Sequence, residues 1–274
     1  MFWNPYALPA LVGGVLCYFV GMCLHDVVQG RAGRWGMGIV LGLLCLPALS
    51  FDLYYVHLAA PPGWYIAWRS MPGIETLAAC WGLLFGFLAA RVHLGLPGQV
   101  LVLALSLLCS AVPFVKPVLH PVEAKGPLQN RWQGTVCLQT SDATCGPASL
   151  ATIFAAYGRH YSEREIARAS YSGASGTELW YLLRFARAHG LRPTRLPPGE
   201  LAAIPLPALL GVTADAAGPF TRSGHFITLL GKNGDHYRIG DPFGERTLTA
   251  AEFQQFYGRV CDVIIFKPER NLSS

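Results

Sequence analysis

Four residues in the C-terminal half of the sequence have the types and the order that thiol chemistry requires, and one of them is Cys145. It stands in the stretch QTSDATCGPASL, directly before Gly-Pro and an apolar run that is typical of a helix. Proline is favoured in the first turn of a helix, where its missing N–H would have no partner anyway. We therefore expect the thiol beside free backbone N–H groups and the positive end of the helix dipole, which favour a nucleophilic thiolate. Taken alone, the pattern is equally typical of a buried cysteine at the start of a core helix.

A thiolate nucleophile needs a base, and the base needs a group that orients it. His225 opens an apolar strand in GHFITLL, where a strand end would hold its ring rigidly, and Asp241 follows 16 residues later in IGDPFG. The Asn-Gly pair at 233–234, between two apolar runs, predicts a hairpin turn. Such a hairpin brings positions 225 and 241 together near the end of one ladder, as a His–Asp dyad requires. Asp-Pro-x-Gly is also an ordinary turn sequence, so the aspartate by itself indicates little.

Gln139 completes the set, six residues before Cys145. Acyl chemistry needs hydrogen-bond donors aimed at the oxyanion that develops in the transition state. The side-chain amide of Gln139 can share that task with the backbone N–H of Cys145. A glutamine near a cysteine means little alone, but Gln, Cys-Gly, Gly-His and Asp-Pro in this order form a far more specific pattern.

Helices come first among the elements that must position these residues. An extended entry over 135–139 precedes a helix that is expected over about 145–157. The sequence SERE at 162–165 is a capping box, which predicts the start of a second helix. Thr177 is expected to cap a third, amphipathic helix that Gly190 closes.

Strand signals dominate the remainder of the sequence. Strands are expected in PALLGV, in the hairpin HFITLLGKNGDHYRIGDP and in RVCDVIIFK, with a short helix opened by Thr249 before the last strand. Helices followed by antiparallel strands predict an α+β domain of about 145 residues.

The N-terminal half has a different composition. Residues 1–120 carry almost no charge, and charged residues make up only 14% of the whole chain, against roughly 25% in an average soluble protein. Apolar stretches lie at about 7–28, 35–58, 73–94 and 98–119. Each has about 22 residues, which as a helix span about 33 Å and match the hydrocarbon core of a bilayer. The sequence therefore predicts a region of four transmembrane helices.

These observations divide the chain into three parts. Residues 1–120 form the predicted transmembrane region, residues 121–130 a Pro/Gly-rich linker, and residues 131–274 the α+β domain. Several glycines of the apolar stretches are expected at close-packed helix–helix positions. They are Gly13, Gly14, Gly21, Gly36, Gly38, Gly42, Gly82 and Gly86.

Arginine in the short loops gives the expected orientation in the membrane. Arg31, Arg34 and Arg91 lie in the first and third loops, whereas Arg69 lies in the second. Positively charged loops tend to stay in the cytoplasm. The count therefore favours an integral, multi-pass protein of a bacterial inner membrane whose C-terminal domain lies in the periplasm or its equivalent.

Several partners are not expected. The formal charge of +5 is mild and shows no Lys/Arg block, so nucleic acid is not an expected partner. No C-x-x-C pair and no His/Cys cluster with zinc spacing occurs, and we expect neither a metal nor a cofactor. Cys137 and Cys261 could pair in an oxidising compartment, or both could be buried thiols.

The stretches QTSDATCGPASL, GHFITLL and IGDPFG resemble those of the bacteriocin-processing, double-glycine leader peptidases, the papain-like domains of peptidase-containing ABC transporters. The similarity covers about residues 131–267. It implies Cys145 as the nucleophile and His225 as the general base. It also implies Asp241 as the residue that orients the base and Gln139 as the oxyanion donor. The implied fold is papain-like, and the implied reaction is cleavage of a peptide, often after paired small residues such as Gly-Gly.

Two features depart from that family. Thr144 stands directly before the cysteine, where family members usually carry an acidic residue, and Asp142 is displaced. No G-x-x-x-x-G-K-[ST] motif occurs, so we expect no nucleotide partner, and four spans are too few for a transporter half of that type. What remains is a stand-alone, membrane-tethered peptidase.

The leading hypothesis is a cysteine peptidase that cleaves a peptide or protein near the membrane through an acyl-enzyme. Its expected partners are a peptide or protein substrate, such as a secreted precursor, and a separate exporter. One alternative is a peptidase-like module that grips a leader peptide or partner without cutting it. The other is an acyl or peptidyl transferase that uses the same thiol with an amine as acceptor.

Overall fold

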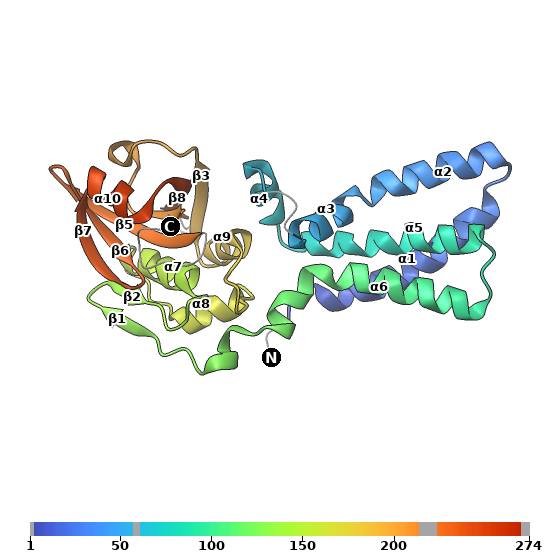
Figure 1. Cartoon of the computed structure of the whole chain (residues 1–274), viewed down its shortest axis with the longest axis horizontal. Coiled ribbons are helices and arrows are strands. Elements are labelled where there is room, and N and C mark those ends of the chain that lie inside the picture. Colours follow the sequence, from blue (N-terminus) through green and yellow to red (C-terminus); the bar gives the residue numbers. More distant parts are fainter. Residues whose placement is uncertain (1–2, 57–60, 214–223, 270–274) are drawn as a thin grey trace, which may run out of the picture. The chain divides into compact units, whose positions relative to one another are not determined.

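The computed structural model of the chain describes residues 3–56, 61–213 and 224–269 (Figure 1). Contacts divide the chain into two compact units, and the boundary in the sequence lies between Leu119 and His120. The sequence placed the end of the transmembrane region at residue 120 and the start of the catalytic domain at residue 131. Residues 120–130 therefore belong, by their contacts, to the C-terminal unit.

The N-terminal unit is helical. Its elements are α1 (Ala7–Val27), α2 (Arg31–Leu44), α3 (Leu46–Tyr55), α4 (Gly63–Arg69), the 3-10 helix η1 (Ile74–Ala79), α5 (Cys80–Arg91) and α6 (Leu96–Leu119). Among the described residues, three continuous segments, α1, η1 with α5, and α6, are long and apolar enough to cross a membrane. A fourth candidate is the pair α2 and α3, which bend by 50° at their junction. The predicted second span ended at residue 58, which lies outside the described residues.

Glycines allow α1 and α5 to pack in direct backbone contact. A Cβ atom added at Gly82 would collide with the carbonyl oxygen of Gly14, and one at Gly86 would collide with that of Tyr18. From the other side, a Cβ at Gly21 would collide with the carbonyl oxygen of Leu83. The sequence-based expectation of close-packed glycines is confirmed at these positions. It is wrong at Gly36 and Gly42, because a Cβ there would meet nothing within 4 Å.

The C-terminal unit combines helices with antiparallel sheets. Its helices are α7 (Cys145–Ala156), α8 (Glu163–Ala169), α9 (Leu179–Ala188) and α10 (Ala250–Tyr257), with the 3-10 helices η2 (Val122–Lys125) and η3 (Leu201–Ala203). Strands β1 (Arg131–Gln133) and β2 (Val136–Leu138) form a small hairpin. The main sheet contains β3 (Leu191–Leu196), β4 (Ala208–Val212), β5 (His225–Asn233), β6 (His236–Asp241), β7 (Gly244–Thr249) and β8 (Val260–Pro268). Its strand order is β3-β8-β4-β5-β6-β7, and every neighbouring pair is antiparallel.

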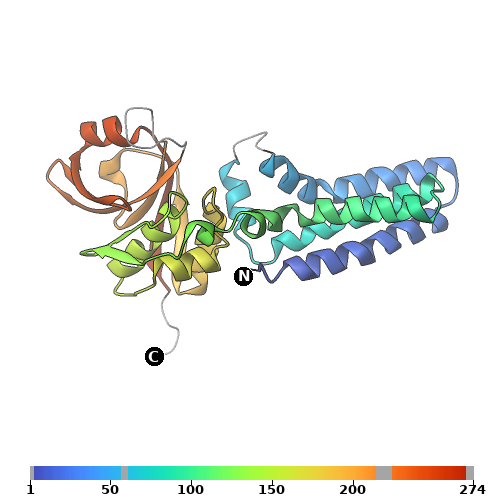
Figure 2. The same ribbon diagram turned by 60° about the horizontal axis from the view of Figure 1, so that its bottom comes forward.

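Helices cover both faces of the main sheet, with α7, α8 and α9 together on one side and α10 on the other (Figures 1 and 2). The α7 face is joined to β5 by two hydrogen bonds. The hydroxyl of Ser149 donates to the carbonyl oxygen of Phe226 at 2.9 Å, and that of Thr228 donates to the carbonyl oxygen of Ser149 at 3.1 Å. On the other face, Phe253 and Tyr257 of α10 join a hydrophobic core with residues of the strands.

The predicted α+β class is confirmed, and most predicted helix starts are correct. Ser162 and Glu165 form the expected capping box of α8, and Thr249 forms one with Glu252 at α10. Thr177 does not cap α9, because its hydroxyl lies 2.6 Å from that of Ser172 and Glu178 occupies the N-cap position instead.

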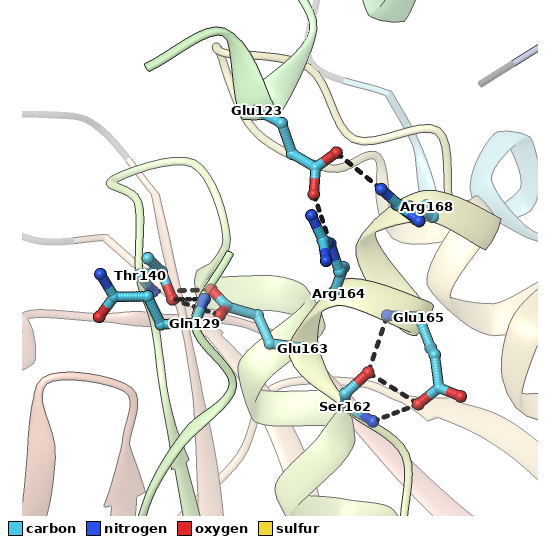
Figure 3. A network of polar contacts seen from close by, with 8 residues as sticks. All are labelled: Glu123, Gln129, Thr140, Ser162, Glu163, Arg164, Glu165 and Arg168. Carbon is cyan, nitrogen blue, oxygen red and sulfur yellow. Dashed lines mark hydrogen bonds and ion pairs between the residues drawn. The ribbon is translucent and has the colours of Figure 1, made fainter. Parts of the chain in front are cut away.

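Residues 120–130, which we call the strap, pack against the helices of the C-terminal unit. Val122 and Leu128 are buried in a small cluster with Ala143 and Ala167. The carboxylate of Glu123 forms ion pairs with two arginines of α8. Nε of Arg164 donates to Oε1 at 2.7 Å, and Nη2 of Arg168 donates to Oε2 at 3.1 Å (Figure 3). The segment that composition alone indicated as a linker is thus an ordered part of this unit.

Candidate active site

Cys145 is the first residue of α7 and is partly exposed. The helix start is packed tightly behind it, since Gly146 and Pro147 are buried. A Cβ at Gly146 would lie 2.8 Å from Cδ1 of Leu182 in α9, so a larger residue could not hold this position without a shift. The Cys-Gly-Pro sequence therefore sets the thiol at a helix N-terminus whose free N–H groups lie beside it.

His225 and Asp241 meet at the ends of β5 and β6. Nε2 of His225 lies 3.1 Å from Oδ1 of Asp241, and the side chains are 5% and 0% exposed. The predicted hairpin is present: Asn233 lies opposite His236, which leaves Gly234 and Asp235 as the turn. The two residues that the sequence placed at one end of a hairpin are therefore in hydrogen-bonding contact.

A β-bulge puts this dyad on one face of the sheet. From Asn233 to Gly231 the strands pair in one register, but the register shifts between Leu229 and Gly231, so Leu230 is an extra residue in β5. Beyond the bulge Thr228 lies opposite Gly240. Continued by one residue, this register sets Asp241 opposite position 227, two residues from His225.

The consequence of the bulge follows from strand geometry. Residues two apart on a strand share a face, and a slip of one residue moves a side chain to the other face. If Leu230 instead paired with Ile239 in an unshifted register, Asp241 would lie opposite Thr228, three residues from His225, and the two side chains would point to opposite faces. Bulges re-aim side chains in this way next to functional sites.

Three further groups hold the carboxylate of Asp241, and sequence reasoning did not find them. The hydroxyl of Tyr257 in α10 donates to Oδ2 at 2.6 Å, and the backbone N–H of Phe243 donates to Oδ1 at 3.0 Å. Nε of Arg246 lies 3.5 Å from Oδ2. Burial alone would raise the pKa of Asp241, but the contacts with His225, Tyr257 and Phe243 outweigh it and lower the pKa below its ordinary value. The carboxylate is therefore ionised and fixed.

The electrostatics of His225 favour a protonated ring. Burial acts to lower its pKa, but the hydrogen bond with Asp241 and a hydrogen bond and charge interaction with Cys145 outweigh burial and raise the pKa to about 9. Because Nε2 faces Asp241, Nδ1 is the ring nitrogen left for Cys145. The His225 ring is therefore protonated at neutral pH and in contact with the thiol of Cys145.

Gln139 is anchored close to the dyad. Its backbone N–H donates to the carbonyl oxygen of Pro242, the residue after Asp241, at 2.9 Å. Its side-chain Nε2 donates to the carbonyl oxygen of Ser141 at 3.1 Å and so retains one further N–H. The residue is 6% exposed. This geometry leaves an amide donor on the loop that leads into Cys145.

The structure thus brings Cys145, His225 and Asp241 together and places Gln139 on the loop before the cysteine. Acyl transfer to sulfur is the chemistry that these groups can perform, with a nucleophile, a base, an orienting carboxylate and an amide donor. Cys137 is buried and Cys261 is partly exposed, and neither is in a disulfide. Burial raises the pKa of the Cys137 thiol to about 12, so that it stays protonated at neutral pH. Among the described residues, no group of three or more His, Cys, Asp or Glu side chains could hold a metal ion.

A family model described as the peptidase C39 family matches residues 134–271. That match includes all four predicted site residues. No curated protein matches the chain.

Solved structures similar to the chain include three peptidase domains. The peptidase domain of Streptococcus ComA, a bifunctional ABC transporter of a quorum-sensing pathway, is 21% identical with a TM-score of 0.42, and the match covers 48% of this chain and 96% of that one. A double-glycine-motif protease of an AMS/PCAT transporter, solved with a leader peptide, is 22% identical with a TM-score of 0.41, covering 52% and 92%. The N-terminal C39-like domain of a toxin secretion ATP-binding protein from Vibrio parahaemolyticus is 14% identical with a TM-score of 0.36, covering 47% and 100%.

Proposed function

Because the chain belongs to the peptidase C39 family, we propose that it is a membrane-tethered cysteine peptidase that cleaves a peptide or protein through an acyl-enzyme. The observation that carries this proposal is the contact of His225 with both Asp241 and Cys145 at the start of a helix. We assign Cys145 as the nucleophile and His225 as the acid–base residue.

In the first half of the reaction the Cys145 thiolate attacks the scissile carbonyl carbon, and a C–S bond forms. Negative charge moves to the carbonyl oxygen, where the Gln139 amide and the backbone N–H of Cys145 would donate hydrogen bonds. The C–N bond then breaks, and the leaving amine takes the proton of the His225 imidazolium. A thioester and a neutral imidazole remain.

In the second half a water molecule gives a proton to the neutral His225 ring and adds to the thioester carbonyl. The C–S bond breaks, the acid product leaves, and the thiolate–imidazolium pair is restored. Asp241 stays ionised throughout and holds the ring in the orientation that both proton transfers need. Its contacts with Tyr257 and Phe243 support that role.

The tether is the helical N-terminal unit. Large apolar side chains are exposed along its candidate spans, among them Leu16 and Phe19 of α1 and Leu101 and Leu108 of α6. Such a surface is stable in lipid and unfavourable in water. We propose an integral protein of a bacterial inner membrane, with the catalytic unit on the extracytoplasmic side. The arginine distribution of the short loops supports this orientation.

We propose a peptide substrate cut after Gly-Gly or similarly small residues, within a secreted precursor that a separate exporter handles. The family match supports a peptide substrate.

The test uses the full-length protein in detergent, with a quenched fluorescent peptide that contains Gly-Gly. Replacing the thiol in Cys145→Ala removes the only proposed nucleophile, so turnover should fall to background. The matched control is Cys261→Ala, which removes another accessible thiol of the same unit and should keep wild-type turnover. Mass spectrometry of the products identifies the cleaved bond.

The outcomes separate this proposal from the alternatives. Binding of the peptide without cleavage, together with slow labelling of Cys145 by iodoacetamide at neutral pH, would indicate a binding module. A product joined to an added amine would indicate a transferase. Full turnover in Cys145→Ala would refute the proposed mechanism.

A further inference from the structure

A buried carboxylate that the proposed mechanism does not use lies beside the Gln139 loop. Glu163 is the first residue of α8 and is 0% exposed. Burying an ionised carboxylate costs several kcal/mol unless hydrogen bonds compensate for the lost water. The partners of this carboxylate are therefore informative about why it is kept inside the unit.

Both oxygens of Glu163 bind one residue, Thr140, which follows Gln139 in the sequence. Oε1 accepts from the backbone N–H of Thr140 at 2.7 Å, and Oε2 accepts from its hydroxyl at 2.6 Å (Figure 3). Hydrogen bonds to an ionised group are short and roughly twice as strong as neutral ones. Glu163 thus holds Thr140 by its backbone and its side chain together.

This contact fixes the peptide unit that joins Gln139 to Thr140. Its N–H is bound by Glu163, and its carbonyl oxygen accepts from Nη2 of Arg131 at 3.1 Å. The preceding peptide unit is held as well, because the N–H of Gln139 donates to Pro242. The backbone is therefore fixed on both sides of Gln139. The hydrogen bond from Nε2 of Gln139 to the carbonyl oxygen of Ser141 then sets the direction of the side chain.

The strap completes the same network. The backbone N–H of Gln129 donates to the hydroxyl oxygen of Thr140 at 3.0 Å, so this hydroxyl both donates to Glu163 and accepts from the strap (Figure 3). Asn130 also accepts from the backbone N–H of Glu163 at 3.3 Å. The strap therefore contacts both residues that form the hydrogen bonds between α8 and the Gln139 loop.

A second glutamate of α8 shows that this arrangement is not a general feature of the helix start. Glu165 binds the backbone N–H and hydroxyl of its own N-cap, Ser162, and lies at the surface (Figure 3). It stabilises α8 without touching the Gln139 loop. The two carboxylates are two positions apart on one short helix and differ in what they hold.

We propose that Glu163 is a positioning residue for the oxyanion hole: it fixes the backbone at Thr140 so that the Gln139 amide is aimed at the developing oxyanion. This inference rests on the proposed function. We therefore expect loss of the Glu163 carboxylate to slow the chemical step more than it weakens folding or peptide binding.

The test compares Glu163→Gln with Glu165→Gln in the full-length protein. Glutamine at position 163 keeps the size of the side chain but replaces one acceptor oxygen with an NH₂ group. An NH₂ group cannot accept a hydrogen bond, so one of the two donors of Thr140 loses its partner. The rate kcat for the Gly-Gly peptide should fall about 10- to 100-fold with KM nearly unchanged, because a misplaced donor costs transition-state stabilisation. Glu165→Gln should keep kcat within about twofold.

Alkylation of Cys145 by iodoacetamide separates positioning from general damage. In that reaction a C–S bond forms and iodide leaves, and no oxyanion develops. The alkylation rate of Cys145, followed by peptide mass spectrometry, should therefore stay at the wild-type value in Glu163→Gln. In a Gln139→Ala background, Glu163→Gln should cause no further loss of kcat, because the donor that it positions is already gone.

Several results would overturn the inference. They are a wild-type kcat in Glu163→Gln, a loss that is undiminished in the Gln139→Ala background, or a parallel loss of alkylation. A wild-type protein that is alkylated at Cys145 but cleaves no peptide would refute the proposed function, and this inference with it.

A milder pair of variants covers the case in which Glu163→Gln does not fold. Thr140→Val removes only the hydroxyl that binds Oε2, whereas Thr140→Ser keeps it. We expect a lower kcat with unchanged alkylation in Thr140→Val and near-wild-type kcat in Thr140→Ser. Equal activity of the two variants would contradict the proposal.

Discussion

At the scale of single residues, the site depends on charges that are held in place rather than merely present. Asp241 is fully buried and receives donors from β5, α10 and the turn that follows β6. His225 is held between this carboxylate and the thiol of Cys145. The raised pKa of the ring is the measurable result.

This raised pKa predicts how activity depends on pH. If the active form is the thiolate–imidazolium pair, kcat/KM falls as pH rises through about 9, the pKa of His225 in the folded protein. A pH–rate profile of the full-length protein measures this alkaline limb. A limb near the ordinary histidine value of 6.5 would contradict the assignment.

The same shift predicts a stability effect with a definite sign. The folded protein holds the His225 proton more tightly than the unfolded chain does. The stabilisation is therefore complete below 6.5, the ordinary value, and is lost as pH rises through about 9. In Cys145→Ala the partner contribution of the thiol disappears, so the pKa of His225 should fall and the alkaline loss should begin at lower pH. Denaturant unfolding at several pH values measures both.

At the scale of elements, the register of β5 and β6 beyond the bulge is the feature that makes a dyad from a hairpin. This register sets Asp241 opposite position 227, two residues from His225, and the side chain of Leu230 plays no part in it. The strap and α8 act in a comparable way on the Gln139 loop, since they fix backbone rather than supply a reacting group.

Deleting Phe226 tests the role of the register. His225 would then be the direct neighbour of position 227, which lies opposite Asp241, so the side chains of His225 and Asp241 would point to opposite faces. We expect turnover to fall by at least about 100-fold, the order of loss that misplaced catalytic groups cause, while circular dichroism still reports the fold. Deleting Leu230 is the matched control, because Leu229 can still pair with Ile239 and Thr228 with Gly240, and this variant should retain most of the activity. An active Phe226 deletion would show that the register does not set the dyad.

Several elements could be predicted from the sequence, and others could not for physical reasons. The cysteine helix and the hairpin have strong local signals in Gly-Pro and Asn-Gly. Strands β3 and β7 were not predicted, because they are the two edges of the sheet and alternate weakly between apolar and polar residues. The position of the bulge could not be predicted, because Leu230 has no unusual strand propensity.

The supporting residues of the site were missed for a different reason. Tyr257 lies 16 positions from Asp241 and Glu163 lies 23 positions from Thr140, on separate elements. Neither pairing follows from spacing in a single sequence, whereas the Cys-Gly and Gly-His pairs are local signals. An aligned set of relatives in which these positions vary together is the kind of signal that could have found them.

At the scale of the whole molecule, two units with separate organisation share one chain. The C-terminal unit is an α+β domain of the peptidase C39 family, and the described part of the N-terminal unit contains three to four candidate membrane spans. The helical unit also contains a buried ion pair, in which Nη2 of Arg69 lies 3.8 Å from Oε1 of Glu75 and both side chains are 0% exposed.

Helix packing in the N-terminal unit predicts which glycines are sensitive to substitution. Gly86→Leu would force α5 away from the backbone of Tyr18 in α1, and overpacking of this kind costs about 1–3 kcal/mol. Gly42→Leu is the matched control, because a Cβ there would meet nothing within 4 Å. Thermal unfolding in detergent, followed by light scattering, should show a lower midpoint for Gly86→Leu only. Equal midpoints would contradict the tight α1–α5 contact.

The strap also bears on where the C-terminal unit could be separated from the helical N-terminal unit. A cut after residue 130 would keep the four proposed catalytic residues but remove Val122, Glu123 and Leu128, which pack against α8 and the residues beside it. The fragment worth purifying therefore begins at His120, ahead of the region that family similarity alone would delimit.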